Sequence, residues 1–139
     1  MNAFRNFASL GALAAVALVT GCTVNSSPAP TTTATAQSTL TVRWSIDGAF
    51  DPNQCASHAA PTLDVRILDQ SNGAVYESTA PCAAFTTTIP IKPGSYTANA
   101  TLVDATGHAR TTTVNLQPFT LADGAANRLD ADFPSSSFF

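Results

Sequence analysis

The sequence predicts an all-β fold, a single antiparallel β-sandwich of about seven strands. Three observations support this prediction. Short segments alternate between apolar and polar residues, which is the pattern of half-buried strands. Gly, Pro, Asn and Asp residues separate these segments, as turns require. The chain holds one Lys and one Glu but many Thr and Val residues, a composition that favours strands over surface helices.

The expected strands follow one another at short spacing. In the first of them, the apolar residues from Leu40 to Ile46 share one face, so Trp44 is expected in the core. Tyr96 is expected in the core by the same alternation, and Thr112, Val114 and Leu116 are expected to share one face of their strand. The seven segments are 40–46, 63–67, 75–78, 85–89, 96–102, 109–116 and 127–133.

Turns and loops connect these segments. Asn72-Gly73 is a hairpin signal between the second and third strands. Lys92-Pro93-Gly94 suits a type II turn, with Pro93 and Gly94 at the two central positions. Segments 49–61 and 118–124 are predicted to be loops without regular structure.

Composition divides the chain of 139 residues into four parts. We expect a signal peptide over 1–21, a tether over 22–38, the sandwich domain over 39–134 and an exposed tail over 135–139. The tether is rich in Ser, Thr and Pro and carries no charge, so it cannot bury enough surface to order itself. The sandwich domain is long enough to bury an adequate core.

The N-terminal segment has the pattern of an export signal. Arg5 gives a positive start, and the uncharged stretch from Ala8 to Val19 is shorter than the roughly 20 apolar residues that span a membrane. Val19-Thr20-Gly21-Cys22 resembles the lipobox of bacterial lipoproteins. The resemblance implies cleavage before Cys22, a diacylglycerol on its thiol, and anchoring in the bilayer by acyl chains such as palmitate. A plain signal peptide with an incidental cysteine is the alternative.

The residue after Cys22 indicates the membrane in which the protein is anchored, and the assignment of Cys22 leaves the other two cysteines as a pair. In related lipoproteins, an Asp directly after the lipidated cysteine tends to retain the protein in the inner membrane. This chain has Thr23 at that position, so the resemblance implies the outer membrane. Once Cys22 is a thioether, Cys55 and Cys82 remain as a pair in an oxidising compartment, and we expect a disulfide. A metal site is the alternative, but the two cysteines lack the usual ligand spacing.

Two short motifs carry a resemblance to a known fold family. Ile91-Lys92-Pro93-Gly94-Ser95-Tyr96 and Leu102-Val103-Asp104-Ala105-Thr106-Gly107 resemble the strand start and hairpin of carboxypeptidase-regulatory-like, transthyretin-like sandwiches. The resemblance covers about the second half of the chain and implies a small two-sheet domain. An immunoglobulin-like strand order is equally open.

Residues suited to catalysis or metal binding are scattered. Asp47, Asp51 and Asn53 lie in one segment, but their spacing matches no calcium loop, and turn formation is the preferred interpretation. His58 and His108 have no nucleophile motif near them. We therefore predict that the protein is not an enzyme and needs no cofactor or metal. Nine acidic residues against six basic ones leave no electrostatic footprint for nucleic acid.

The remaining candidates are surfaces for binding. Phe50 and Tyr76 are the aromatic residues expected to be exposed, and they are a candidate platform for sugar. The loop 48–61, fixed by Cys55, is the best candidate contact surface, although an ordinary strand connection explains it equally well. We expect a non-catalytic binding module in the cell envelope with a protein or glycan partner. The alternative is a structural or accessory subunit of an envelope complex.

Overall fold

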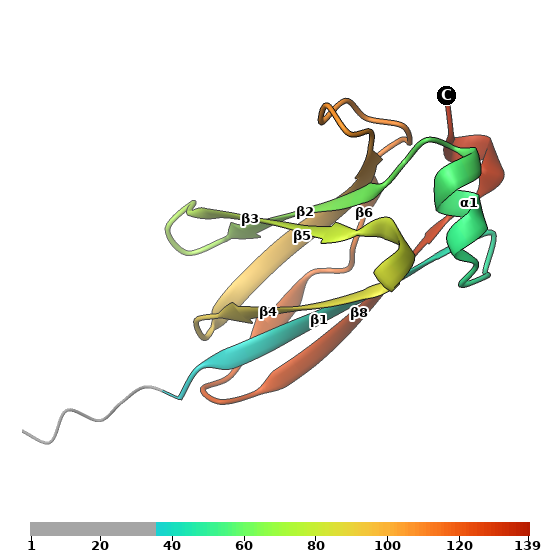
Figure 1. The fold of residues 1–139 in the computed structure, drawn as a ribbon. Helices are drawn as coiled ribbons and strands as arrows, with labels where there is room; N and C mark the ends of the chain where they lie inside the picture. The colour runs from blue at the N-terminus through green and yellow to red at the C-terminus, as the bar shows by residue number, and fades with distance from the viewer. Residues whose placement is uncertain (1–35) are drawn as a thin grey trace, which may run out of the picture. The chain divides into compact units, whose positions relative to one another are not determined.

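A computed structural model describes residues 36–139, which form two β-sheets packed face to face (Figure 1). This confirms the all-β sandwich, with eight strands in the described part. One sheet has the order β4-β1-β8, and the other has the order β3-β2-β5-β6, with β7 also pairing with β5. The strands are β1 (Ser38–Ile46), β2 (Thr62–Asp69), β3 (Val75–Pro81), β4 (Thr86–Ile91), β5 (Gly94–Val103), β6 (Val114–Asn115), β7 (Phe119–Leu121) and β8 (Ala126–Phe133).

Strand β1 is the centre of the three-stranded sheet. It pairs antiparallel with β4 and parallel with β8 along its length. Its predicted alternation is confirmed, because every second residue from Leu40 to Ile46 is buried. Trp44 and Tyr96 are both buried in the core, as predicted.

The β2–β3 hairpin also follows the prediction. Gly73 has a φ of 71°, which is the left-handed region that Gly adopts without strain. The Asn72 side chain accepts a hydrogen bond from the Ala74 amide at 2.8 Å. These two residues therefore close the turn between Asp69 and Val75.

The predicted strand 109–116 is wrong in most of its length. Residues 110–113 lie opposite only 101–102, because Ala109 opposes Val103 while Val114 opposes Ala100. In this bulge the Thr111 hydroxyl accepts from the Leu102 amide at 3.1 Å, and Thr111 is only 1% exposed. Thr112, predicted to share a face with Leu116, is exposed, whereas Leu116 is buried.

Two predicted loops contain regular structure. Segment 118–124 contains β7, which pairs with the first residues of β5. Segment 49–61 contains the helix α1 (Pro52–Ser57). A second short helix, the 3-10 helix η1 (Cys82–Ala84), follows β3, so the strand expected from Phe85 begins at Thr86.

The type II turn predicted at Lys92-Pro93-Gly94 is also wrong. A type II turn needs a positive φ at Gly94, and Gly94 is not among the described glycines that have one. Gly94 is required for space instead, since a Cβ atom there would lie 3.0 Å from the Tyr96 hydroxyl oxygen. That hydroxyl donates a hydrogen bond to the Lys92 carbonyl at 2.7 Å.

The C-terminal residues are not the exposed tail that the sequence predicted. Ser135–Ser137 form the 3-10 helix η2, and Ser137 is buried. Phe138 packs against the core and forms a β-bridge with Thr111, while Phe139 remains exposed. Pro134 precedes the serines of this short helix as its N-cap residue.

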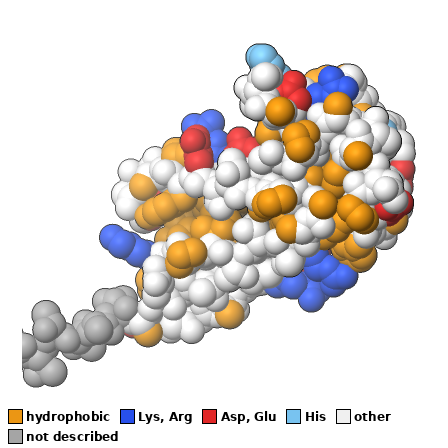
Figure 2. All heavy atoms as spheres, in the orientation of Figure 1, with side chains coloured by type: hydrophobic (Ala, Val, Ile, Leu, Met, Phe, Trp, Pro, Cys, Tyr) orange, Lys and Arg blue, Asp and Glu red, His pale blue; other side chains and the backbone are white. Residues whose placement is uncertain are grey.

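On the face shown in Figure 2, apolar side chains gather along the seam between the sheets, and charged side chains lie mostly around the margin. Within residues 36–139 no helix is long and apolar enough to cross a membrane.

Candidate functional site

The lipidation site proposed from the sequence lies outside the described residues. Cys22 and residues 23–35 of the expected tether precede residue 36, where the structural description begins. The chain enters the sandwich at Ser38, at the end of the domain away from α1 and the C-terminus (Figure 1). The candidate contact segment 48–61 therefore lies at the end opposite to the point where the expected tether joins.

The first part of this segment is a tight turn that ends β1. Asp47 and Gly48 both have positive φ values, 49° and 71°, and Ile46 and Ala49 exchange two backbone hydrogen bonds across them. This is the geometry of a two-residue type I′ hairpin turn, for which Asp-Gly is a preferred sequence. The Asp132 carboxylate accepts from the Gly48 amide at 2.9 Å and the Ser45 hydroxyl at 2.7 Å, so β8 also holds the turn.

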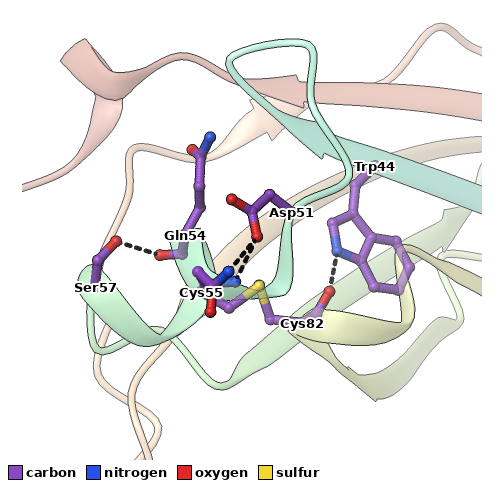
Figure 3. The surroundings of a disulfide bond; sticks show 7 residues. Trp44, Asp51, Gln54, Cys55, Ser57 and Cys82 are labelled. Atoms are coloured by element: carbon purple, nitrogen blue, oxygen red, sulfur yellow. Dashed lines mark hydrogen bonds between the residues drawn. A yellow bond between two sulfur atoms is a disulfide. The ribbon is translucent and has the colours of Figure 1, made fainter.

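The helix α1 follows directly and begins at a defined cap. The Asp51 carboxylate accepts from the Asn53 amide at 2.9 Å, and Pro52 occupies the first helical turn (Figure 3). A capping Asp followed by Pro is a helix-start signal, so the sequence did carry evidence for this helix. Asp51 therefore caps a helix, whereas the sequence predicted only a turn-forming residue in a loop.

The predicted disulfide joins α1 to η1. Cys55 and Cys82 are bonded, with their Cα atoms 6.0 Å apart, and both are buried. The Trp44 indole N–H donates to the Cys82 carbonyl at 2.9 Å, so the bridge is also tied to β1 (Figure 3). The pairing of Cys55 with Cys82 is confirmed.

Phe50 is the exposed aromatic residue of this site. It is 49% exposed, and its ring meets the buried Phe85 ring edge to face at a centroid distance of 5.8 Å. The Arg43 guanidinium carbon lies 4.4 Å from the Phe50 ring centroid, within the range of a cation–π contact. The sequence did not predict this stacking, because Arg43 lies in β1 and the turn alone brings Phe50 back beside it.

Tyr76, the other aromatic candidate, is not part of this site. It lies at the β2–β3 hairpin, opposite Ile67, and its ring meets Tyr96 at 6.3 Å. That hairpin and α1 lie at different ends of the sandwich (Figure 1). The sugar platform of Phe50 with Tyr76 is therefore not formed.

A shallow hollow of about 330 Å³ lies between α1 and η1. Its lining is almost entirely of small apolar residues and carries no charged side chain; it includes Pro52, Cys55, Ala56, Ala59, Pro61 and Ala83. Such a surface suits an apolar group of a partner and offers no group that acts as an acid or base.

The two histidines lie apart and serve local structure. The His58 ring stacks on Phe138 at a centroid distance of 3.8 Å, and its carbonyl accepts from the Arg110 side chain at 3.2 Å. His108 lies in the turn that begins at Asp104, whose carboxylate accepts from the Thr106 hydroxyl at 2.6 Å. Hydrogen bonds from Thr106, then from the His108 amide, lower the pKa of Asp104 to about 2.

Within residues 36–139 there is no group of three or more His, Cys, Asp or Glu side chains that could hold a metal ion. The site around α1 therefore consists of the exposed Phe50 ring, the Arg43 guanidinium stacked on it from β1, and an apolar hollow beside the disulfide.

Fold and site together define the described part of the chain as a small disulfide-bridged β-sandwich domain. No protein-family model matches the chain. No curated protein matches it either. Among solved structures, it is similar at 12% identity and a TM-score of 0.36 to a Bacteroides thetaiotaomicron structure named "putative polysaccharide binding proteins (DUF1812)". The match covers 68% of this chain and 46% of that one, so this chain spans about half of its length.

Proposed function

We propose that this protein is an exported lipoprotein that presents a non-catalytic binding module in the bacterial cell envelope. In this proposal the chain is cut before Cys22, acylated there and held at the outer membrane. Residues 22–37 are the tether, because Ser38 already belongs to β1, and the sandwich is the module. The partner is an envelope protein or a glycan.

The observation that carries the proposal is the use of the three cysteines. Cys55 and Cys82 are bonded to each other, which is typical of an oxidising compartment. Cys22 is the one remaining cysteine of the chain, and it ends the sequence that resembles a lipobox. An unpaired thiol in an exported protein needs an explanation, and a thioether to lipid provides it.

The contact site in this proposal is the segment 48–61 together with Arg43. The Asp47-Gly48 turn, the Asp51 cap and the disulfide hold the segment in one conformation, so binding requires little further ordering. The exposed Phe50 ring and the apolar hollow supply contact area at the end of the domain opposite Ser38.

Anchoring is tested by incorporation of labelled fatty acid in the native host. The unchanged protein is expected to take up label, and Cys22→Ala is expected to take up none and to remain an uncut precursor. The double variant Cys55→Ser/Cys82→Ser is the matched control and should still be labelled. Label on Cys22→Ala would contradict the proposal.

Partner binding is tested by photo-crosslinking in intact envelopes from a probe at position 50. A probe at Thr79, on the exposed face of β3, is the control. Capture of one defined protein would favour an accessory subunit, and capture of a glycan would favour a sugar-binding module. The same products from both positions would exclude this site.

A second variant tests the hollow. Ala56→Arg places a long charged side chain at its edge and should abolish the specific crosslink from position 50. Ser57→Arg changes the neighbouring exposed residue, which does not line the hollow, and should leave the crosslink in place. Equal crosslinking in both variants would exclude the hollow as part of the contact.

A further inference from the structure

Strand β8 forms one border of the three-stranded sheet. It pairs with β1 from Ala126 to Phe133, and in the described part of the chain no strand lies along its other side. In the opposing sheet, β6 and β7 both pair with β5. An edge strand of this length presents a row of backbone groups to which another strand can pair.

The direction of these backbone groups follows from two hydrogen bonds. The Ala125 carbonyl accepts from the Thr39 amide at 2.9 Å, and the Phe133 carbonyl accepts from the Asp47 amide at 3.1 Å. Both carbonyls therefore point toward the β1 side of the strand. Since direction alternates along a strand, the even-numbered residues of β8 direct their amides and carbonyls to the free side. The Arg128 amide indeed donates to the Asn127 side chain, at 2.9 Å, and not to another strand.

The side chains at this edge form a pattern that is complementary to itself. Arg128 and Asp130 are exposed on the outer face, and their charged groups lie 3.2 Å apart. An exposed pair within one strand adds little stability, so these groups can exchange partners at low cost. On the inner face, Leu129 and Val114 pack against the core but remain partly exposed.

We propose that β8 is a contact between two copies of this chain. Two β8 strands pair antiparallel about Leu129 and join the two three-stranded sheets into one. Arg128 then faces Asp130 of the second copy, and the reverse pair forms by symmetry. Leu129 meets Leu129 of the second copy at a non-hydrogen-bonded position, where side chains approach most closely and exclude water from each other.

Charge selects this register. The direction of the backbone groups requires a symmetric pair to be centred on one residue, and only centres at Leu129 and Asp130 align seven of the eight residues of the strand. A pair centred on Asp130 would place the two Asp130 carboxylates, one from each copy, opposite each other. A centre at Leu129 gives two attractive pairs and no like-charged pair, because Asp132 then faces Ala126.

The first test uses a symmetric disulfide in the full chain, in native membranes. Leu129→Cys should give a reducible dimer, since paired Cβ atoms at this position lie about 5 Å apart. Thr88→Cys, on the opposite edge strand β4, is the control and should remain monomeric, as should the unchanged protein. A monomeric Leu129→Cys, or equal dimer from both variants, would overturn the proposal.

The second test does not depend on cysteine. Sedimentation equilibrium of the full chain in detergent should show a dimer that Arg128→Asp or Asp130→Arg weakens by roughly tenfold, because attractive pairs become repulsive. The double variant Arg128→Asp/Asp130→Arg should restore it. A monomeric unchanged protein, or restoration by Arg128→Asp/Asp132→Arg instead, would overturn the contact or its register. The sedimentation test does not require a lipid anchor, so a failure there is separate from a failure of anchoring.

Discussion

Trp44 connects the sheet to the disulfide. Its ring is buried and lies 6.4 Å from the Phe85 ring, and its indole N–H binds the Cys82 carbonyl. One side chain therefore stabilises β1, η1 and the residue against which Phe50 packs. This makes Trp44 the residue whose loss should affect both the core and the candidate site.

Trp44→Ala should lower the free energy of unfolding by about 3–5 kcal/mol, the usual cost of truncating a large buried aromatic. Trp44→Phe keeps most of the buried area but removes one donor to the Cys82 carbonyl, which still accepts from the Phe85 amide at 3.2 Å, so the loss should be about 0.5–1.5 kcal/mol. Denaturant unfolding of the oxidised protein measures both. Equal stability of Trp44→Ala and the unchanged protein would contradict the packing described.

Asp104 makes stability depend on acid pH. Hydrogen bonds from Thr106 and His108 lower its pKa from 3.8 to about 2, so the ionised form favours the folded state. This contribution is complete above pH 3.8 and should be lost as the pH falls toward about 2. Unfolding measured across this window should show a smaller loss for Asp104→Asn than for the unchanged protein. A carboxyl that titrates by NMR at or above 3.8 would contradict this.

Among the elements, the β4–β5 connection depends on Gly94 for space. Gly94→Ala would bring a methyl group within 3.0–3.2 Å of the Tyr96 hydroxyl and ring. Because Tyr96 is buried, the ring cannot move freely, and we expect a loss of about 1–3 kcal/mol. Burial also raises the pKa of Tyr96, which keeps its hydroxyl protonated as a donor to Lys92.

Gly107→Ala is the comparison for this prediction. At Gly107 a Cβ atom would meet nothing within 4 Å, but φ is 84°, so any cost there comes from the backbone alone. Shortening Tyr96 to Leu should remove the clash and reduce the cost of Gly94→Ala. An unchanged cost in the Tyr96→Leu background would show that the backbone and not the ring requires Gly94.

The disulfide links helix α1 to the short helix η1. Cys55 and Cys82 are 27 residues apart, and closing a loop of this size contributes about 3–4 kcal/mol in the chain-entropy model. Cys55→Ser should lose about this much stability. Helix α1 has only six residues, so its amide protons should also exchange faster in this variant. Unchanged exchange would mean that the bridge does not stabilise α1.

For the whole molecule, the count of free thiols combines the bridge with the anchor. The mature protein, denatured without reductant, should show no reactive thiol if Cys22 carries lipid and Cys55 is bonded to Cys82. One reactive thiol would leave the bridge intact and contradict lipidation. Two or more would contradict the bridge.

Some features of this protein could be predicted from the sequence, and others could not. Alternation alone identified the core residues of β1, β2 and β5, because a strand with one buried face repeats every two residues. The pairing of Cys55 with Cys82 also followed from the sequence, once Cys22 was assigned to the lipobox. Export, lipidation and the outer-membrane location rest on the sequence alone.

The tertiary structure decided what depends on residues far apart in the chain. The bulge at Thr111 exists because its hydroxyl takes the place of a backbone partner for Leu102, which no local pattern reveals. The stacking of Arg43 on Phe50 requires the turn to fold Phe50 back beside β1. Phe138 is covered because His58, 80 positions earlier in the sequence numbering, lies against it. Periodicity reports which face of a strand is buried, whereas these contacts depend on which strands and loops meet in space.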